Sequence, residues 1–386
     1  MKKIYNYNVN FYGNEKKYIN RCISSTWIST NGNFVNQFES KISKLENFKY
    51  AVATNSGTSA LHLALIIEGI CLTDEVIVPT ITFVSTVNVI LYCNASPIFM
   101  DCTDDFIIDE LKTIHFILNK TKFNGKFSIN CKTKKIIKAI FIVNVWGVKK
   151  ELKDLEKICK SRNIKIIIDA AESFGSKFFI KNSNKNIKYT SCYSFNANKV
   201  ITTGAGGAIL TNSSKIKQKA FYLSTQAKKD PLFFVHDNLG YNYRMSNLHA
   251  AIGLGQIEKS EKILKKKKEI SLIYNKYLSN MNNVVFNYKD ISLINSSNCW
   301  MNVITFKNSN FNLKKFIYFM KKKKIFIKPV WKLNHLQRFL NSYEKYKIKN
   351  AYRLVKNSCC LPSSNDLTLK EIKYICRSIM NFNLKL

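Results

Sequence analysis

Short runs of β-branched and apolar residues alternate with segments of helical periodicity between about residues 50 and 210. The runs of period two or of continuous apolar character predict strands at 50–54, 75–78, 97–100, 136–143, 164–168, 191–194 and 207–211. Helices are expected between them at 59–68, 85–92 and 150–161. This alternation is typical of an α/β fold with a mostly parallel central sheet and helices on its faces.

The pattern changes after residue 245. The segment 247–276 predicts a long helix or a helix pair, and short strands at 284–286, 303–306 and 325–328 follow it, mixed with helices. We therefore expect a large α/β domain over 31–260 and a smaller α+β domain made of 1–30 together with 261–386. The Lys- and Asn-rich segment 120–133 has little periodicity and predicts an insertion loop.

The charge balance is strongly basic, with 61 Lys and Arg against 25 Asp and Glu. Nucleic acid, an anionic membrane and phosphorylated substrates all attract such a chain. Nearly all the charge is Lys, however, while dedicated phosphate and base readers favour Arg. Lys, Asn and Ile are enriched together, as in A/T-rich genomes. We therefore favour a solvated Lys-rich surface, with runs such as 265–268 and 321–324 on outer helix faces, and expect no nucleic-acid partner.

Two further absences narrow the class of protein. No apolar stretch reaches the roughly 18–20 residues that cross a bilayer, and none follows the charged start, so we expect a soluble, cytoplasmic protein with no membrane partner. The 11 cysteines are scattered, without C-x-x-C or zinc spacing. They predict reduced thiols and no metal site.

Small and hydroxyl-bearing residues form the run TNSGTSA at 54–60, where the first predicted strand meets its helix. Small side chains let a ligand approach the backbone, and the N–H groups at a helix start attract anions such as phosphate. Ser, Thr and Asn are also common helix caps, which is the alternative for this run taken alone.

An acidic residue, Asp169, directly follows the predicted strand 164–168 and begins the run DAAES. At that position it lies at the carboxyl edge of the sheet, where ligands bind in open α/β folds. A helix cap is the alternative.

One lysine, Lys199, lies in the segment SFNANKVITTGAGG at 194–207, between a strand end and a Gly-rich turn. The segment holds no other basic residue, and partial burial gives a lysine nucleophilic character. A Gly-rich turn without chemistry is the alternative. A fourth run, GYNYRMS at 240–246, contains Arg244, for which a helix end or a surface ion pair is the simpler role.

The order of these motifs is what pyridoxal phosphate requires: a phosphate cradle, an acid for the pyridine nitrogen and, thirty residues after the acid, a lysine for the covalent bond. The chain resembles the DegT-type nucleotide-sugar aminotransferases, a branch of the aspartate-aminotransferase fold (fold type I). The resemblance extends from WISTNG at 27–32 to LPSS at 361–364. It implies a cytoplasmic transaminase that uses pyridoxal phosphate.

The resemblance also implies roles for single residues. Lys199 would bond covalently to the cofactor and later carry protons between cofactor and substrate. Asp169 would pair with the pyridine nitrogen, and Glu172 would lie near the cofactor's 3-hydroxyl.

The remaining implied roles concern the phosphate and the ring. Gly57, Thr58 and Ser194 would bind the phosphate, and Phe83 would stack on the ring, unless it is simply a core residue. Asn242 would reach the phosphate bound by the neighbouring subunit, so that the active sites are shared in a homodimer. We extend this role across the subunit boundary to the adjacent arginine of the 240–246 run.

A narrower resemblance concerns the substrate. STQAK at 224–228, CNASP at 93–97 and KPVW at 328–331 are similar to segments of enzymes from legionaminic-acid and bacillosamine pathways. Those enzymes aminate C4 of a nucleotide-linked 4-keto-6-deoxy-N-acetylhexosamine with glutamate, for surface-glycan or nonulosonic-acid biosynthesis. Two residues depart from the family pattern: Asn144 replaces a usual His, and Ala205 replaces Glu or Gly. Neither change removes a group needed for the covalent chemistry.

Other functions are weighed against this one. Sugar dehydratases of the same family carry His in place of the covalent lysine, so Lys199 argues against a dehydratase, while 3-amination of the sugar stays open. A basic nucleic-acid-binding protein rests on charge alone. A dinucleotide-dependent oxidoreductase would need G-x-G-x-x-G after the first strand, which the chain lacks.

Overall fold

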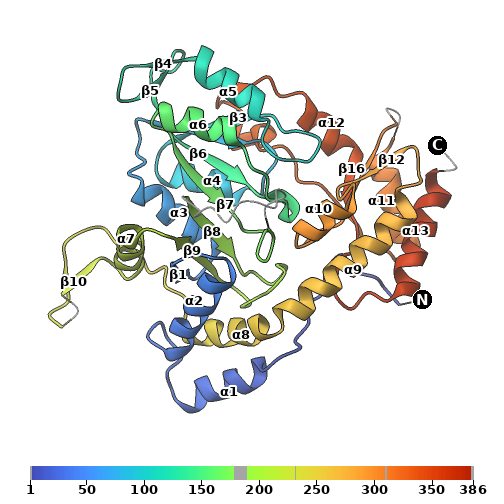
Figure 1. Cartoon of the computed structure of the whole chain (residues 1–386), viewed down its shortest axis with the longest axis horizontal. Coiled ribbons are helices and arrows are strands. Elements are labelled where there is room, and N and C mark those ends of the chain that lie inside the picture. The colour runs from blue at the N-terminus through green and yellow to red at the C-terminus, as the bar shows by residue number, and fades with distance from the viewer. Residues whose placement is uncertain (1, 178–188, 231, 309–310, 384–386) are drawn as a thin grey trace.

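The computed structural model describes residues 2–177, 189–230, 232–308 and 311–383. Figure 1 shows a central sheet flanked by helices and, beside it, a smaller lobe built around the long helix α9 and the carboxyl-terminal helix α13. The architecture is α/β and agrees with the predicted fold class.

The main sheet has ten strands, eight of them on one continuous path. In order across the sheet these are β1 (Tyr50–Thr54), β9 (Gly207–Thr211), β8 (Thr190–Ser194), β7 (Lys165–Asp169), β6 (Ile136–Val143), β2 (Asp74–Pro79), β3 (Ser96–Met100) and β15 (Lys345–Tyr346). Neighbours from β8 to β15 run parallel, whereas β9 is antiparallel to both β8 and β1. The strands are almost wholly buried because helices cover both faces.

The helices of this part are α2 (Asn33–Leu45), α3 (Gly57–Ile67), α4 (Ser85–Tyr92), α5 (Glu110–Asn119), η1 (Val145–Gly147), α6 (Lys153–Ser161), α7 (Ser214–Ser224) and α8 (Asn247–Glu258). Three of them, α3, α4 and α6, lie close to the predicted ranges 59–68, 85–92 and 150–161, and α8 begins at the predicted residue 247, whereas α2, α5 and α7 were not predicted. Local side-chain caps fix several starts: Ser56 accepts from Ser59 N at α3, and Ser213 accepts from Ile216 N at α7.

The segment 120–133 is not the loop that its composition predicts. It forms a hairpin of β4 (Thr121–Phe123) and β5 (Ser128–Asn130), and β5 pairs with β6 at the sheet margin. The turn uses Gly125 at a φ of 90° and Asn124, whose side chain accepts from two following backbone N–H groups. Turn chemistry and tertiary pairing therefore outweigh the weak periodicity of the segment.

The smaller lobe contains an antiparallel sheet with the order β12 (Val284–Phe286), β13 (Val303–Phe306), β16 (Ser358–Cys360) and β14 (Lys328–Pro329). Its helices are α9 (Ser260–Leu278), α10 (Ile291–Ser296), α11 (Leu313–Lys322), α12 (Asn350–Asn357) and α13 (Leu369–Asn383), with η2 (Asn334–Leu336) and η3 (Arg338–Leu340) between them. Near the chain start, Ile4 forms a β-bridge with Ile325, whereas α1 (Glu15–Ser24) packs against α8.

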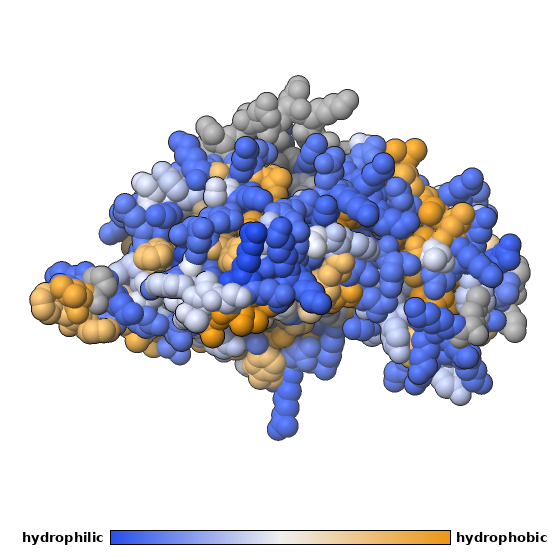
Figure 2. Space-filling model, turned by 90° about the horizontal axis from the view of Figure 1, so that it is seen from below, coloured by the Kyte–Doolittle hydropathy of each residue, from blue (hydrophilic) through white to orange (hydrophobic). Residues whose placement is uncertain are grey.

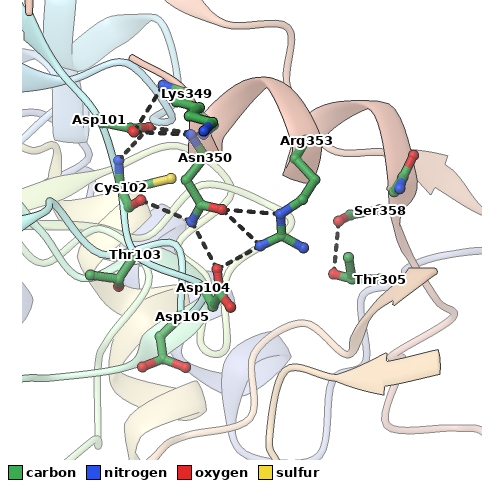
Figure 3. A network of polar contacts seen from close by, with 12 residues as sticks. Asp101, Cys102, Thr103, Asp104, Asp105, Thr305, Lys349, Asn350, Arg353 and Ser358 are labelled. Atoms are coloured by element: carbon green, nitrogen blue, oxygen red, sulfur yellow. Dashed lines mark hydrogen bonds and ion pairs between the residues drawn. The ribbon is translucent and has the colours of Figure 1, made fainter. Parts of the chain in front are cut away.

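One buried carboxylate connects the two lobes. Asp101, which follows β3, accepts hydrogen bonds at the start of α12 from the backbone N–H groups of Lys349 and Asn350 (Figure 3) and of Ala351. It also forms a 2.6 Å ion pair with Lys112. Helix α12 has no cap of its own. A residue about 250 positions earlier in the chain therefore caps it and fixes it to the main sheet.

The outer surface is mostly hydrophilic, with an apolar tip at one end of the molecule (Figure 2). A hairpin of β10 (Lys228–Asp230) and β11 (Val235–His236) projects there, and Leu232, Phe233 and Phe234 are more than 70% exposed. No helix among the described residues is long and apolar enough to cross a membrane.

Candidate active site

The predicted residues Lys199, Glu172 and Asp169 meet at the carboxyl ends of β7 and β8. Lys199 lies in the turn after β8, with its side chain only 13% exposed. Its Nζ is 3.6 Å from Glu172 Oε1 and 4.3 Å from the centroid of the Trp300 ring. A primary amine is thus held in a nearly dry site between a carboxylate and an aromatic face.

Asp169 is a buried carboxylate whose hydrogen bonds only partly offset the cost of its burial. Its Oδ2 accepts from Thr86 Oγ1 at 2.6 Å, and its Oδ1 accepts from Ala171 N at 3.0 Å. Burial raises the pKa of Asp169, while these two hydrogen bonds and the charge of Lys199 act in the opposite direction. A cationic ring nitrogen beside this carboxylate would offset the cost of its burial.

Glu172 lies three residues further on and also contacts backbone. Its Oε2 accepts from Trp146 N at 2.8 Å. Burial raises the pKa of Glu172 to about 7, although the nearby Lys199 charge and the Trp146 N–H lower it. Glu172 therefore binds a proton more readily than a free carboxyl group does, and its carboxyl group is suited to a hydrogen bond with a hydroxyl group.

The predicted phosphate cradle brings together the start of α3 and the end of β8. A Cβ atom on Gly57 would come within 2.7 Å of the Cβ of Ser194, so this close approach requires glycine. Ser56 caps α3, and Gly57 and the half-buried Thr58 follow it at the first turn. Helix capping and anion binding are therefore compatible in this run, because Ser56 caps the helix while Gly57 and Thr58 are placed to bind an anion.

Phe83 is not a core residue. Its side chain is 54% exposed and meets Trp331 edge to face, with 6.3 Å between ring centroids. Asn334 fixes the preceding loop by donating from Nδ2 to the carbonyl oxygens of Thr80 and Thr82. An exposed ring on a fixed loop is suited to cover a planar ligand.

The loop with Asn242 docks beside the cradle of its own chain. Asn55 Nδ2 donates to Asn242 O at 3.1 Å, and Asn55 N donates to Tyr243 O at 2.8 Å. The Asn242 side chain is exposed. Its expected contact with a partner subunit's phosphate stays a prediction.

Arg244 is buried within its own chain. Its guanidinium forms an ion pair with Glu39, donates to Ala53 O at 3.1 Å and lies 5.0 Å from the Phe221 ring. These contacts exclude a surface ion pair, whereas the expected action of Arg244 across a subunit boundary stays a prediction. The arginine holds the 240–246 loop against β1 and α2.

Several residues at the site carried no local signal in the sequence. Tyr7 donates from its hydroxyl to Lys199 O at 2.6 Å, and Trp300 donates from Nε1 to Asn198 O at 2.7 Å. Both come from segments far away in the chain. Thr86, the partner of Asp169, could have been found as the hydroxyl residue one turn after Phe83.

The two departures from the family pattern occupy different environments. Asn144 is buried beneath the site, where its Nδ2 donates to Ser173 Oγ at 3.0 Å and its backbone N donates to Asp169 O. Ala205 is exposed on the turn after Lys199. Asn144 thus supports the strand end that carries Asp169, and Ala205 contacts none of the three central residues through a hydrogen bond.

The residues present fit pyridoxal phosphate. Lys199 offers the amine for its aldehyde carbon, Asp169 a carboxylate for its pyridine nitrogen, and Glu172 a carboxyl group for its 3-hydroxyl. The glycine-dependent cradle at Gly57 offers helix N–H groups for its phosphate.

Comparison with known proteins agrees with this geometry. Residues 11–380 match the DegT/DnrJ/EryC1/StrS aminotransferase family. The chain is 35% identical over 384 residues to GDP-perosamine synthase of Escherichia coli O157:H7, covering 99% of both chains. It is 28% identical to UDP-4-amino-4,6-dideoxy-N-acetyl-beta-L-altrosamine transaminase of Helicobacter pylori, covering 89% of this chain and 88% of the relative.

Solved structures share the fold. Helicobacter pylori PseC, an aminotransferase involved in the biosynthesis of pseudoaminic acid, superposes with a TM-score of 0.85 at 24% identity, covering 98% of this chain and 99% of that one. The family match spans nearly the whole chain and includes Lys199, Asp169, Glu172 and the cradle. The protein therefore belongs to the DegT/DnrJ/EryC1/StrS aminotransferase family and is a nucleotide-sugar transaminase.

Proposed function

We propose that the protein transfers the amino group of glutamate to C4 of a nucleotide-linked 4-keto-6-deoxyhexosamine, N-acetylated or not, with pyridoxal phosphate as cofactor. The observation that carries the proposal is the buried Lys199 amine, 3.6 Å from Glu172 and beside the buried Asp169. Pyridoxal phosphate supplies the chemistry: it takes an amino group from an amino acid and gives it to a ketone.

The protein's own groups have separate tasks in this reaction. Lys199 holds and returns a proton at the carbon that changes hybridisation, because its amine is the mobile base of the site. Asp169 keeps a proton on the ring nitrogen. Glu172 orients the ring by a hydrogen bond to its hydroxyl group. The low exposure of all three excludes water, which strengthens each of these interactions.

The relatives support the class of substrate. The Escherichia coli relative is named for a GDP-linked sugar and the Helicobacter pylori relative for a UDP-linked sugar. Both names describe amino sugars. A panel of keto sugars linked to GDP, UDP and CMP, each incubated with enzyme, pyridoxal phosphate and glutamate, tests the proposal. We expect one keto sugar to gain an amino group while glutamate becomes 2-oxoglutarate.

Lys199→Ala is the matched control for this assay. It removes the amine but leaves the turn, whose backbone is held by Tyr7 and Trp300. Wild type should be yellow with pyridoxal phosphate, and borohydride should fix the added mass on Lys199. Amination by Lys199→Ala without an added amine would refute the proposal. Loss of a sugar hydroxyl without amination would instead support the dehydratase alternative.

We also propose that the active enzyme is a homodimer with shared active sites. The exposed apolar tip of the β10–β11 hairpin supports this, since surfaces of this kind mark protein contacts (Figure 2). The hairpin leads directly into the loop with Asn242, which lies at the cradle. A second copy that covers the hairpin would therefore approach the site. Sedimentation of wild type and of Phe233→Asp tests the homodimer. We expect wild type to sediment as a dimer and the variant to dissociate.

A further inference from the structure

Lys267 is the one fully buried lysine of helix α9, whose other lysines are exposed or half-buried. Helix α9 buries one stripe of side chains, Ile263, Lys267, Ile270 and Tyr274, at helical spacing. Lys267 is 1% exposed, which corrects the expectation that all of 265–268 lies on an outer face. A cation therefore occupies a position where the helix pattern calls for an apolar residue.

The Lys267 ammonium group has neutral partners. Its Nζ donates to the carbonyl oxygens of Ser363 and Trp300, the latter at 3.4 Å, and it lies 5.2 Å from the centroid of the Tyr7 ring. No carboxylate of the described residues lies within ion-pair distance of it. Burial lowers its pKa to about 7, while Cys299 and the exposed Asp366 act in the opposite direction.

Two residues that Lys267 contacts, Tyr7 and Trp300, also hold Lys199. The Tyr7 hydroxyl donates to Lys199 O at 2.6 Å. The Trp300 indole donates to Asn198 O at 2.7 Å, and its ring lies 4.3 Å from Lys199 Nζ. Lys267 thus contacts the backbone of Trp300 and the ring of Tyr7, the two residues whose side chains fix the backbone and the amine of Lys199.

Stability does not explain a lysine at this position. An ammonium group buried among carbonyl oxygens, without a counter-ion, costs the folded state more than a methionine of similar length would. Methionine would also continue the apolar stripe of α9.

We propose that Lys267 is a positioning residue that fixes Trp300 and Tyr7 so that Lys199 presents its amine correctly to pyridoxal phosphate. This inference rests on the proposed function, because it assumes that Lys199 bonds to the cofactor. Lys267 does not touch the reacting atoms and acts through its two neighbours.

The test compares Lys267→Met with wild type, Lys267→Arg and the half-buried neighbour variant Lys266→Met. Three quantities are measured: the melting temperature of the protein without cofactor, the rate at which visible absorbance develops on mixing with pyridoxal phosphate, and kcat and KM for the sugar. Borohydride fixation followed by mass spectrometry shows whether the bond forms at Lys199.

For Lys267→Met we expect a melting temperature equal to or above that of wild type, together with a rate of covalent bonding and a kcat about tenfold lower or more. The KM for the sugar should stay within about twofold. Lys267→Arg should recover much of the rate, since it keeps the donors, and Lys266→Met should behave as wild type. Tyr7→Phe, which removes only the hydroxyl bonded to Lys199 O, should slow bonding in the same way.

Two results would overturn the inference alone. One is a Lys267→Met protein that bonds the cofactor at the wild-type rate. The other is a variant that fails to fold or melts well below wild type, since the lysine would then act through stability. Wild type that forms no bond at Lys199 overturns the proposed function, and this inference with it, so the two failures are distinguishable.

Discussion

Replacing Asp101 by asparagine tests whether one carboxylate joins the two lobes. The side chain is fully buried and accepts from Lys112 Nζ at 2.6 Å and from Cys102 N. It also accepts from three N–H groups at the start of α12 at 2.8–2.9 Å, among them those of Lys349 and Asn350 (Figure 3). Asparagine has nearly the same shape. It lacks the charge, however, and its NH₂ group would face donors instead of acceptors.

The expected loss is about 3 kcal/mol of unfolding free energy. Removing one partner of a buried ion pair costs about 3–5 kcal/mol. The loss for Asp101→Asn lies at the lower end of this range because Lys112 is 30% exposed and can regain water. For a chain of 386 residues, the unfolding entropy is about 0.8 kcal/mol per degree, so the melting temperature should fall by about 4 °C.

The stability difference between wild type and Asp101→Asn should depend on pH. Burial by itself would raise the pKa of Asp101, but Lys112 and the N–H groups of α12 outweigh burial and hold the pKa below its ordinary value of 3.8. A depressed pKa stabilises the fold above the unfolded value, and this contribution is lost as the pH falls through the folded value. The stability gap between wild type and Asp101→Asn should therefore be constant near neutral pH and close below about pH 4.

Thermal unfolding followed by circular dichroism measures both effects. Asp154→Asn is the matched control, because its side chain is 76% exposed and its pair with Lys157 is a surface pair. The control should melt within about 1 °C of wild type. The capping role would be refuted if Asp101→Asn had the same melting temperature as the control. It would also be refuted if the stability difference between wild type and Asp101→Asn were unchanged at pH 3.

Three further predictions concern the site. Asp169→Asn should lower kcat far more than Glu172→Gln does. The asparagine lacks the charge that holds a proton on the ring nitrogen, whereas the glutamine still donates to the 3-hydroxyl. Equal kcat values for the two variants would contradict the role of Asp169 at the ring nitrogen. Gly57→Ala should weaken pyridoxal phosphate binding about tenfold or more in a cofactor titration, since its Cβ meets β8 at 2.7 Å, and unchanged affinity would disprove the cradle. Lys199→Ala and Asn242→Ala chains are refolded together. If Asn242 acts across subunits, the random mixture should recover up to about a quarter of wild-type activity, because half of the dimers are mixed and each of these has one intact site of two. If Asn242 acts within its own subunit, the mixture should show no more activity than the sum of the parents.

Much of the fold was determined by local pattern. The strands at 50–54, 136–143 and 207–211 begin and end where the apolar runs do, because a buried strand must be continuously apolar. The sequence also placed Asp169 and Lys199 at strand ends. They meet because β7 and β8 are parallel neighbours in the sheet, so that the carboxyl ends of the two strands share an edge.

Tertiary structure decided which side chains support that site. The helical period places Lys267 on the buried face of α9, although a lysine is normally expected at the surface. Its burial depends on hydrogen bonds to two backbone carbonyl oxygens from distant segments, which the sequence does not reveal. The same holds for Arg244, which finds Glu39 more than 200 residues away, and for Phe83, whose apolar ring stays exposed. Periodicity reports which face of an element is buried. It carries no information about which partners, separated by hundreds of residues, satisfy a buried polar group, because such contacts exist only once the chain is folded.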